Sequence, residues 1–395
     1  MTTLSYFADE SVLPTSTLTE LFFKAVDEHA SRIAFERMVS DVELSGITYS
    51  EAFTVVKKAS DALGAQGIVR GDRAVILSEN RPEWALADYA CLCAGVIDVP
   101  IYPTLTPSQV AYALKDSGAK LVFASSYEQV IKALEAVEEC PQEIQIVVFD
   151  SLSEMPAGVL SWEGFLELGV ATSSSAASDE DFRKSALEAQ PDDVATIIYT
   201  SGTTGDPKGV MLTHNNISSN VEVCSSLLPV VAGADNTVSF LPLSHILQRT
   251  SDYLFFRTGC RIGYPRSIPT LIQDMGVIRP TVVVSVPRIY EKIYNNVMGA
   301  SGIKKALINW AAGVADRVAD LRLTGREPSG VLALQYGLAD KLVFSKVKAG
   351  VGGRVRLFLS GGGPLAPVLN RFFYSIGLTI LEGYGLTETS PVTNA

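Results

Sequence analysis

Short apolar runs alternate with segments of helical periodicity along most of the chain. The runs are rich in valine and isoleucine and read as buried strands at residues 74–78, 95–101, 120–124, 145–149, 195–199, 238–245, 281–286, 355–359 and 378–382. Apolar residues recurring every three or four positions predict helices at 18–30, 50–63, 130–138, 303–321 and 331–347, with further helix starts near Pro82 and Thr106. This alternation predicts an α/β fold in which a parallel sheet is covered by helices on both faces.

Local signals refine this pattern. Ser50 is the expected N-cap of the helix that follows it, and Pro82 is expected in the first turn of its own helix. The stretch at 171–181 is rich in serine, alanine and aspartate and predicts a flexible connection. The helices at 303–321 and 331–347 are expected to carry basic outer faces. No internal repeat recurs at the ~20–50-residue periods of solenoids and propellers, which excludes those architectures.

Composition narrows the class of protein. The chain of 395 residues is 47% apolar and only 19% charged, which is typical of a packed globular protein. The net charge of −11 argues against a general nucleic-acid binder, and no long basic run marks an anionic-membrane patch. We expect no secretory signal and no membrane-spanning segment. The five cysteines lack the spacing of a zinc site and are expected to be reduced thiols, which favours a cytoplasmic location.

One polar stretch stands out against this background. Residues 199–210 read Tyr-Thr-Ser-Gly-Thr-Thr-Gly-Asp-Pro-Lys-Gly-Val and directly follow the strand at 195–199. Glycines let backbone N–H groups turn inward, hydroxyls donate hydrogen bonds, and Lys208 supplies positive charge, which together suit a triphosphate. A polar turn between strands is the simpler alternative, but the glycine spacing and the number of hydroxyls exceed what a turn requires. The stretch is not a Walker A loop, because Pro207 precedes Lys208 and Gly209 follows it.

Four loops follow predicted strands, at Thr200, His245, Gly361 and Gly383. In open α/β sheets, ligands bind beyond the carboxyl ends of the strands, so we expect these loops to converge on one crevice.

The last of these loops carries separate chemistry. Glu388 offers a hard oxygen ligand for Mg²⁺, Tyr384 offers a flat face for an adenine, and Gly383 and Gly385 allow close approach of the backbone. On the residues alone, the alternative is a solvated glutamate beside an ordinary turn. A lone His245 is likewise more often structural than catalytic, and Trp84 is expected in the core.

These motifs resemble those of the adenylate-forming superfamily, which includes acyl-CoA synthetases, luciferases and the adenylation domains of peptide synthetases. Residues 199–210 match every fixed position of the signature loop, residues 382–389 resemble the Gly-Tyr-Gly-x-Thr-Glu motif, and residues 360–365 resemble the adenine loop, with Gly363 where alanine is usual. The segments at 241–245, 286–292 and 303–347 look like those of long-chain fatty acyl-CoA synthetases.

The resemblance implies a fold and a domain organisation. The chain is expected to form the large N-terminal domain of the adenylate-forming fold, with αβαβα layers of parallel and mixed sheets and parts of a distorted β-barrel. Two βα subdomains are expected at roughly residues 45–190 and 191–395. The family continues with a Tyr-x-x-Gly-Asp segment and a small C-terminal lid domain carrying a lysine. Because this chain stops at Ala395 without them, we expect part of a longer synthetase, with poor adenylation, exposed apolar surface and a tendency to self-associate.

The resemblance also implies an activity: ATP-dependent activation of a long-chain fatty acid to an acyl adenylate and pyrophosphate, then transfer to coenzyme A, with Mg²⁺ required. Implied catalytic residues are His245, Thr387, Glu388 and Lys208, and Mg²⁺ would lie between Thr200 and Glu388. The substrate acid would meet His245, with Gln248 and Arg249 in the acyl tunnel near Asn220. ATP would be bound by Thr200, Ser201, Gly202, Thr203, Thr204, Gly205, Lys208, Gly362, Gly363, Pro364, Glu382, Gly383, Tyr384, Gly385 and Thr387.

Other interpretations stay open at this point. Gly361-x-Gly363-x-x-Ala366 followed by Glu382 approximates a dinucleotide-binding fingerprint, although it lies near the end of the chain rather than in a first βαβ unit. A non-catalytic module that holds nucleotide or acyl adenylate is a second alternative. Within the family, aryl, amino and fatty acid substrates share these loops. The sequence leaves acyl chain length, a homodimer and peripheral membrane association open.

Overall fold

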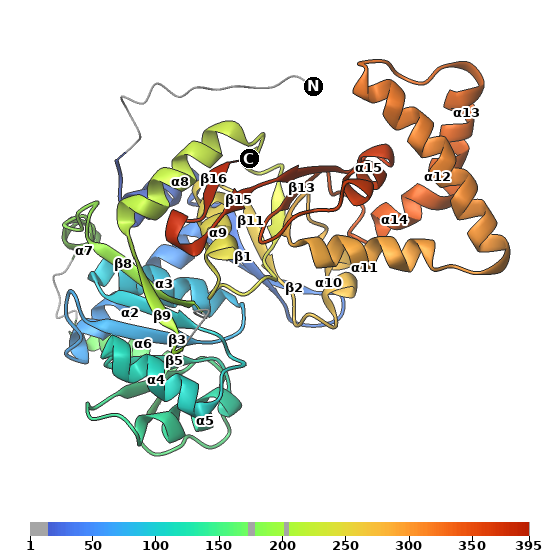
Figure 1. Cartoon of the computed structure of the whole chain (residues 1–395). Coiled ribbons are helices and arrows are strands. Elements are labelled where there is room, and N and C mark those ends of the chain that lie inside the picture. The colour runs from blue at the N-terminus through green and yellow to red at the C-terminus, as the bar shows by residue number, and fades with distance from the viewer. Residues whose placement is uncertain (1–14, 173–177, 201–204, 395) are drawn as a thin grey trace.

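The computed structural model describes residues 15–172, 178–200 and 205–394 and contains two seven-stranded sheets (Figure 1). The first sheet has the order β7-β6-β5-β3-β4-β8-β9 and is parallel except for the β8–β9 pair. Its strands are β3 (Arg73–Leu77), β4 (Ile97–Ile101), β5 (Leu121–Ala124), β6 (Gln145–Val148), β7 (Val159–Ser161), β8 (Val194–Thr200) and β9 (Lys208–Thr213).

The second sheet has the order β14-β13-β12-β10-β11-β1-β2 and is parallel except for the β1–β2 pair. Its strands are β1 (Ile33–Met38), β2 (Leu44–Thr48), β10 (Asn236–Val238), β11 (Arg261–Tyr264), β12 (Val282–Ser285), β13 (Leu357–Ser360) and β14 (Thr379–Glu382). A separate antiparallel ribbon joins β15 (Tyr384–Gly385) to β16 (Val392–Asn394).

Helices fill three layers around the two sheets. They are α1 (Leu18–His29), α2 (Tyr49–Ala65), α3 (Pro82–Ala94), α4 (Pro107–Ser117), α5 (Tyr127–Val137), α6 (Trp162–Thr172), α7 (Asp179–Ala186), α8 (His214–Leu227), α9 (Ile246–Arg257), α10 (Leu271–Ile278), α11 (Pro287–Met298), α12 (Gly302–Leu323), α13 (Gly330–Ala339), α14 (Ser345–Ala349) and α15 (Pro367–Ser375). A π-helical turn at Asp340–Phe344 joins α13 to α14, and a 3₁₀ turn spans Thr387–Thr389.

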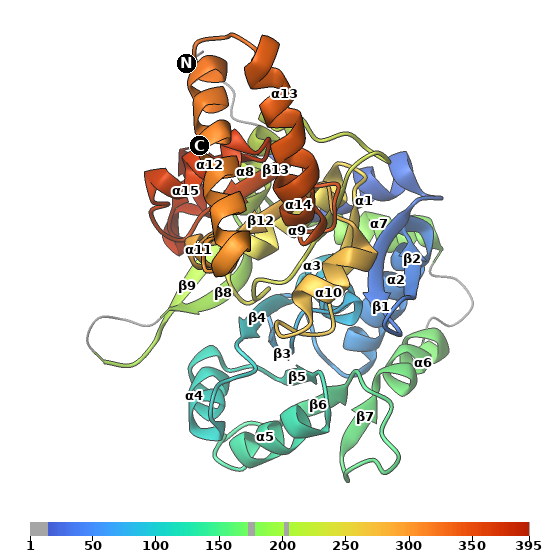
Figure 2. The same cartoon turned by 90° about the vertical axis from the view of Figure 1, so that its right-hand side faces the viewer.

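Three apolar clusters identify the layers. One lies between the first sheet and α4 and α5, a second joins the two sheets through α1, α2, α3, α8 and α9, and a third lies between the second sheet and the helices from α10 to α15. Figure 2 shows α4 and α5 below the first sheet and the α12–α13 pair at the opposite end of the molecule. The expected αβαβα layering is thus confirmed, and no closed barrel forms within the described residues. The subdomain boundary near residue 190 stays a prediction.

Several local expectations need correction. Thr48, not Ser50, caps α2, two residues earlier than expected. Its hydroxyl accepts from the Glu51 N–H while the Glu51 carboxylate accepts from the Thr48 N–H, so both groups of the capping box are satisfied. Pro82 begins α3 as expected. The segment at 171–181 is not simply a connection, because α6 extends to Thr172 and α7 begins at Asp179; residues 173–177 lie outside the described part.

The predicted strand at 238–245 is also wrong, because β10 ends at Val238. Residues 239–245 leave the sheet and run past the first sheet toward the N-terminus of α9. Pro242 lacks a backbone donor, and neighbouring backbone groups are paired with the Asn80 side chain instead of a strand. The five cysteines carry free thiols, as expected. Among the described residues, none of the helices is long and apolar enough to cross a membrane.

Candidate active site

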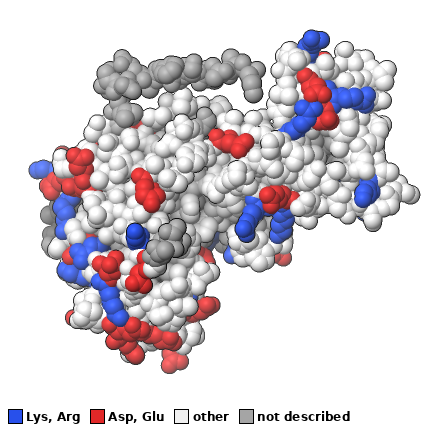
Figure 3. All heavy atoms as spheres, in the orientation of Figure 1, with Lys and Arg blue, Asp and Glu red and all other residues white. Residues whose placement is uncertain are grey.

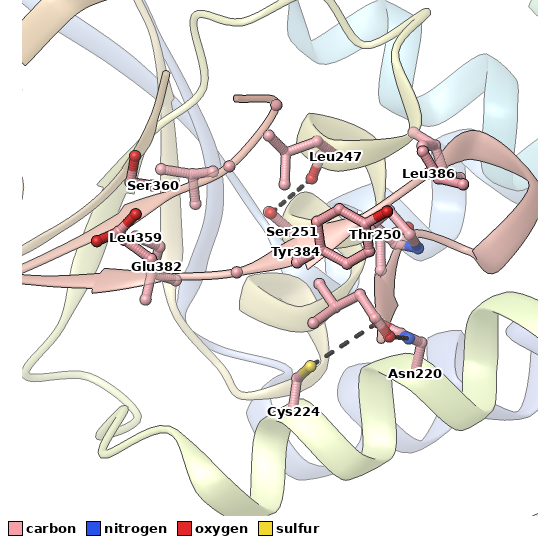
Figure 4. Close-up of a pocket in the computed structure, with 18 of the residues that line it drawn as sticks. Asn220, Cys224, Leu247, Thr250, Ser251, Leu359, Ser360, Glu382, Tyr384 and Leu386 are labelled. Atoms are coloured by element: carbon pink, nitrogen blue, oxygen red, sulfur yellow. Dashed lines mark hydrogen bonds between the residues drawn. The ribbon is translucent and has the colours of Figure 1, made fainter. Parts of the chain in front are cut away.

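A cavity of about 860 Å³ lies at the carboxyl ends of the second sheet's strands, between α8, α9 and the β15–β16 ribbon (Figure 4). Thr200, His245, Gly361 and Gly383 all line it, so the four predicted loops do meet in one place. The loops at His245, Gly361 and Gly383 follow strands of the second sheet, whose parallel strands place their carboxyl ends along one edge, whereas Thr200 ends β8 of the first sheet. The predicted residues that also line this cavity are Gly362, Gly363, Pro364, Glu382, Tyr384, Gly385, Thr387 and Glu388.

The β15–β16 ribbon forms one wall of the cavity. The Tyr384 side chain is 65% exposed and its ring projects over the cavity in Figure 4. Asn220 on α8 holds this ribbon from the other side, because its Nδ2 donates to the Val392 carbonyl at 2.7 Å. The Glu388 carboxylate is exposed and has no hydrogen-bond or ion-pair partner among the described residues. The wall therefore presents a free aromatic face and a free carboxylate.

His245 is held in one tautomer by the helix that it caps. Its Nδ1 accepts a hydrogen bond from the Leu247 N–H at 3.2 Å at the start of α9, so the neutral ring carries its proton on Nε2. The side chain is partly open to the cavity, but the surrounding packing desolvates the ring and lowers the pKa of His245 below its usual value. At neutral pH the residue is thus an uncharged Nε2–H donor at the cavity wall.

A helical stripe of mostly apolar residues forms the floor of the cavity. The contributing residues of α9 are Ile246, Leu247, Thr250, Ser251, Leu254 and Phe255, those of α8 are Asn220, Cys224 and Leu227, and Leu228 follows directly after α8. Asn220, Cys224 and Leu227 are spaced by four and three positions and therefore lie along one face of α8, as Leu247, Thr250 and Leu254 do on α9. We did not predict this stripe apart from Asn220, although the spacing was readable in the sequence. The floor suits an apolar group, whereas the loops opposite suit a polar one.

The other predicted residues lie elsewhere. Gln248 and Arg249 are buried and do not line the cavity, because one step along a helix turns a side chain by about 100° to another face. The Gln248 Nε2 donates to Asp252 at 2.7 Å, and the Arg249 guanidinium is paired with two carboxylates. Gly205 and Lys208 are exposed outside the cavity lining, with Lys208 opposite Thr200 in the β8–β9 register. Ser201, Gly202, Thr203 and Thr204 lie outside the described residues.

Comparison with known proteins assigns the chain to a family. Residues 22–395 match the family described as AMP-binding enzyme. The chain belongs to this family. It is 34% identical over 361 residues to long-chain-fatty-acid–CoA ligase FadD15 of Mycobacterium bovis, covering 91% of this chain and 58% of that protein. It is 35% identical over 370 residues to the peroxisomal long chain acyl-CoA synthetase 6 of Arabidopsis thaliana, covering 92% and 50%.

Solved structures of lower identity show the same fold. The adenylation domain of a carboxylate reductase from Mycobacterium chelonae is 24% identical, with a TM-score of 0.71 over 95% of this chain and 58% of that one. The N-terminal domain of FACL13 from Mycobacterium tuberculosis is 19% identical, with a TM-score of 0.67 over 95% and 77%. The AMP-binding chain spans only about half of the length of the two curated relatives named above.

Within this AMP-binding fold, Asn80 fixes the segment that leads to His245. The Asn80 Nδ2 donates to the Leu241 carbonyl at 2.7 Å and to the Ser239 hydroxyl at 3.2 Å, and its Oδ1 accepts from the Leu243 N–H at 2.9 Å. Asn80 follows β3 of the first sheet, whereas the segment follows β10 of the second. One side chain thus joins the two sheets two residues before His245.

We predict that Asn80→Ala releases His245 without unfolding the protein. The segment loses three hydrogen bonds, so the ring should be better solvated and the pKa of His245 should rise toward the usual value of about 6.5. The chain has only three histidines, so ¹⁵N-histidine NMR can follow each ring, with His245→Gln as the assignment. Asn236→Ala is the matched control, because Asn236 donates to the Ile278 carbonyl away from this segment. An unchanged His245 titration in Asn80→Ala would contradict the assignment.

Proposed function

We propose that this chain supplies the ATP- and carboxylate-binding part of a ligase that activates a long-chain fatty acid as its adenylate and then forms its coenzyme A thioester. The observation that carries the proposal is the cavity in which a predicted phosphate-binding loop end, a neutral histidine and an adenine-type loop meet above an apolar floor. Membership of the AMP-binding family and the curated relatives' names support the same class of reaction.

The proposed nucleotide contacts follow from the cavity wall. Residues 361–364 and Tyr384 would hold the adenine end, since glycine backbone permits close approach and the tyrosine ring is free to stack. Thr387 would meet the α-phosphate. Thr200, residues 201–205 and Lys208 would hold the β- and γ-phosphates from the β8–β9 turn.

The donor set also fits a hard divalent cation. Glu388 has an unpartnered carboxylate at the cavity wall and Thr200 contributes a hydroxyl to the same cavity. Mg²⁺ usually takes one or two protein oxygens and fills its other positions with phosphate and water. Glu388 and Thr200 would therefore hold Mg²⁺, which supplies charge neutralisation for the phosphates when it is bound.

The proposed reaction has two steps. In the first step a carboxylate oxygen bonds to the α-phosphorus while the bond from that phosphorus to the pyrophosphate oxygen breaks, so the two anions must be held in line. The His245 Nε2–H would donate to the carboxylate oxygen that does not attack and so orient the acid. In the second step the coenzyme A sulfur, having lost its proton, bonds to the acyl carbon and AMP leaves.

The substrate class rests on the floor of the cavity. Leu227, Leu228, Leu254 and Phe255 offer apolar contacts and no buried charge to an alkyl chain. An amino acid substrate would need a partner for its ammonium group, and the acidic residues of the lining, Glu382 and Glu388, lie on the ribbon side rather than on the helical floor. This arrangement favours a fatty acid over an amino acid, with aryl acids as the second candidate.

Glu388→Gln tests the proposal directly. We expect slow adenylation by this chain, and its pyrophosphate release from ATP and palmitate should still depend on Mg²⁺ and fall about a hundredfold in this variant, because the charge that faces the metal is lost. Glu139→Gln, an exposed carboxylate outside the cavity, should match the unmodified chain. Benzoate and leucine serve as competing acids. Release that is equal in the two variants, or absence of any ATP binding, would overturn the proposal.

A non-catalytic nucleotide-binding module is distinguished in the same assay. Tight binding of palmitoyl sulfamoyl adenosine without pyrophosphate release from any acid would favour that alternative. The free thiols of all five cysteines support a cytoplasmic location, which we retain as a proposal. Homodimer formation and peripheral membrane association stay predictions.

A further inference from the structure

The α12–α13 hairpin projects from the outer helical layer at the upper right of Figure 1. Sequence periodicity predicted basic outer faces for both helices, but the outer face of α13 is apolar. Val331, Leu334 and Leu338 are 71%, 76% and 50% exposed. Their spacing of three and four residues aligns them along one face of α13, so they form a continuous apolar stripe rather than scattered single residues.

The inner face of the same hairpin is buried against the rest of the protein. Ala311, Val314, Ala315 and Ala339 are buried in the cluster that packs on the second sheet. The Arg317 Nη2 donates to Gln335 Oε1, which fixes α12 against α13. The hairpin is thus held firmly by one side, and the stripe is not needed for its packing.

Basic side chains stand at both ends of the stripe. Arg326 lies in the turn before Val331, and Lys341 lies three residues after Leu338; both are exposed and neither is paired with a carboxylate among the described residues. Figure 3 shows several blue side chains over the hairpin, with a group of red side chains between some of them.

The hairpin differs in charge from the rest of the protein. Residues 301–350 contain eight lysine and arginine residues against four aspartate and glutamate residues, a net charge of +4. Because the whole chain carries −11, the rest of it carries −15. An extended anionic surface attracts this part of the molecule and repels the remainder, so it would meet the protein with the hairpin first.

We propose that the α12–α13 hairpin docks this protein on an anionic lipid surface. The stripe Val331, Leu334, Leu338 enters the boundary between headgroups and acyl chains, with α13 lying in the plane of the interface. Arg326 and Lys341 extend their side chains to the lipid phosphates at either end. The proposal does not depend on the reaction, because the surface contains none of the residues of the cavity.

Vesicle flotation of the whole chain, without substrates, tests this proposal. The chain is expected to float with vesicles of phosphatidylcholine and phosphatidylglycerol at low salt, and to bind vesicles of phosphatidylcholine alone far more weakly. Val331→Gln, Leu334→Gln and Leu338→Gln combined should lower binding about tenfold, because glutamine keeps helix propensity but removes the apolar contact. Arg326→Glu with Lys341→Glu should lower it about twentyfold and weaken the salt dependence.

The matched control replaces three exposed apolar residues elsewhere by glutamine. Val42, Ile268 and Ile272 are 82%, 54% and 51% exposed and lie outside the hairpin. Their combined variant should bind vesicles like the unmodified chain, with circular dichroism confirming that all variants are folded. Equal binding by the stripe variant, or no binding of the unmodified chain to the anionic vesicles, overturns the proposal. Loss of a concentration-dependent dimer in the stripe variant with vesicle binding unchanged would assign the stripe to a second copy instead.

Discussion

Replacing Gly385 by alanine is expected to abolish nucleotide binding while leaving the protein folded. A Cβ at this position would lie 1.5 Å from the Pro391 carbonyl oxygen and 2.5 Å from its carbon. Both atoms belong to the backbone of the opposite arm of the β15–β16 ribbon, so no side-chain rotation can relieve the clash. The ribbon must open, which moves Tyr384, Thr387 and Glu388 together.

The loss should be local and large. Gly385 belongs to none of the apolar clusters that join helices and sheets, so the thermal midpoint should change little. Displacement of binding groups by even 1 Å can cost about a hundredfold, and we expect at least that loss in the affinity for Mg·ATP measured by calorimetry. The result would be wrong if Gly385→Ala bound ATP as the unmodified chain does.

Gly363→Ala is the matched control in the same cavity. The nearest atom to a Cβ there is Pro287 Cγ at 3.8 Å, an ordinary van der Waals contact, and the backbone of Gly363 does not require positive φ. This variant also restores the residue usual in the family's adenine loop. We expect unchanged affinity for Mg·ATP. That result would show that Gly385 is needed because a Cβ there would collide with the Pro391 backbone, and not because every glycine of the cavity is needed.

The layers of the fold could be predicted because each strand and helix signal is local. Val/Ile-rich runs gave β3, β5, β6, β12 and β14 close to their observed bounds, and the order of the loops placed the site at the carboxyl edge. The antiparallel pairs β1–β2 and β8–β9 could not be predicted, since strand direction depends on partners distant in sequence. β10 was overextended because the apolar run continues after Val238, where Asn80 takes over the backbone partners.

The site was predictable in its loops and less so in its floor. Tyr384 and Glu388 were selected because residues 382–389 resemble a family motif, since on the residues alone a solvated glutamate beside an ordinary turn stayed open. Gln248 and Arg249 were predicted in the acyl tunnel, but helical rotation turns Arg249 toward Thr196 and Asp98 of the first sheet and Gln248 toward Asp252 of its own helix. The same rotation turns Leu247 and Ser251 toward the cavity. Reading the face of α9 would have selected the residues of that helix that line the cavity.

Arg249 carries the second large expected effect, on stability rather than on binding. Its side chain is 1% exposed, and its Nη2 lies 2.5 Å from Asp88 and 2.5 Å from Asp98. Its Nη1 donates to Thr196 at 2.7 Å. Burial raises the pKa of Asp88, and although burial opposes its charge, the two carboxylates raise the pKa of Arg249. The Arg249 guanidinium therefore supplies the positive charge that stabilises the two buried carboxylates.

Arg249→Met should lower the free energy of unfolding by about 3–5 kcal/mol, because it leaves two carboxylates buried without a cation. Urea denaturation measures the change. Arg371→Met is the matched control, since Arg371 also pairs with two aspartates, Asp316 and Asp320, but in solvent, and its loss should cost less than about 1 kcal/mol. Adding Asp88→Asn and Asp98→Asn to Arg249→Met should recover much of the stability.

Equal effects of Arg249→Met and Arg371→Met would contradict this account.

The ion cluster and the cavity lie on opposite faces of α9. Asp88 and Asp98 belong to the layer around the first sheet, while the opposite face of α9 lines the cavity and its N-terminus holds His245. A weakened ion cluster should loosen the cavity floor and the histidine together. A ligand would then have to re-order α9, which lowers its apparent affinity, so ligand binding should stabilise Arg249→Met less than it stabilises the unmodified chain. An equal stabilisation by ligand would mean that α9 keeps its position without the cluster.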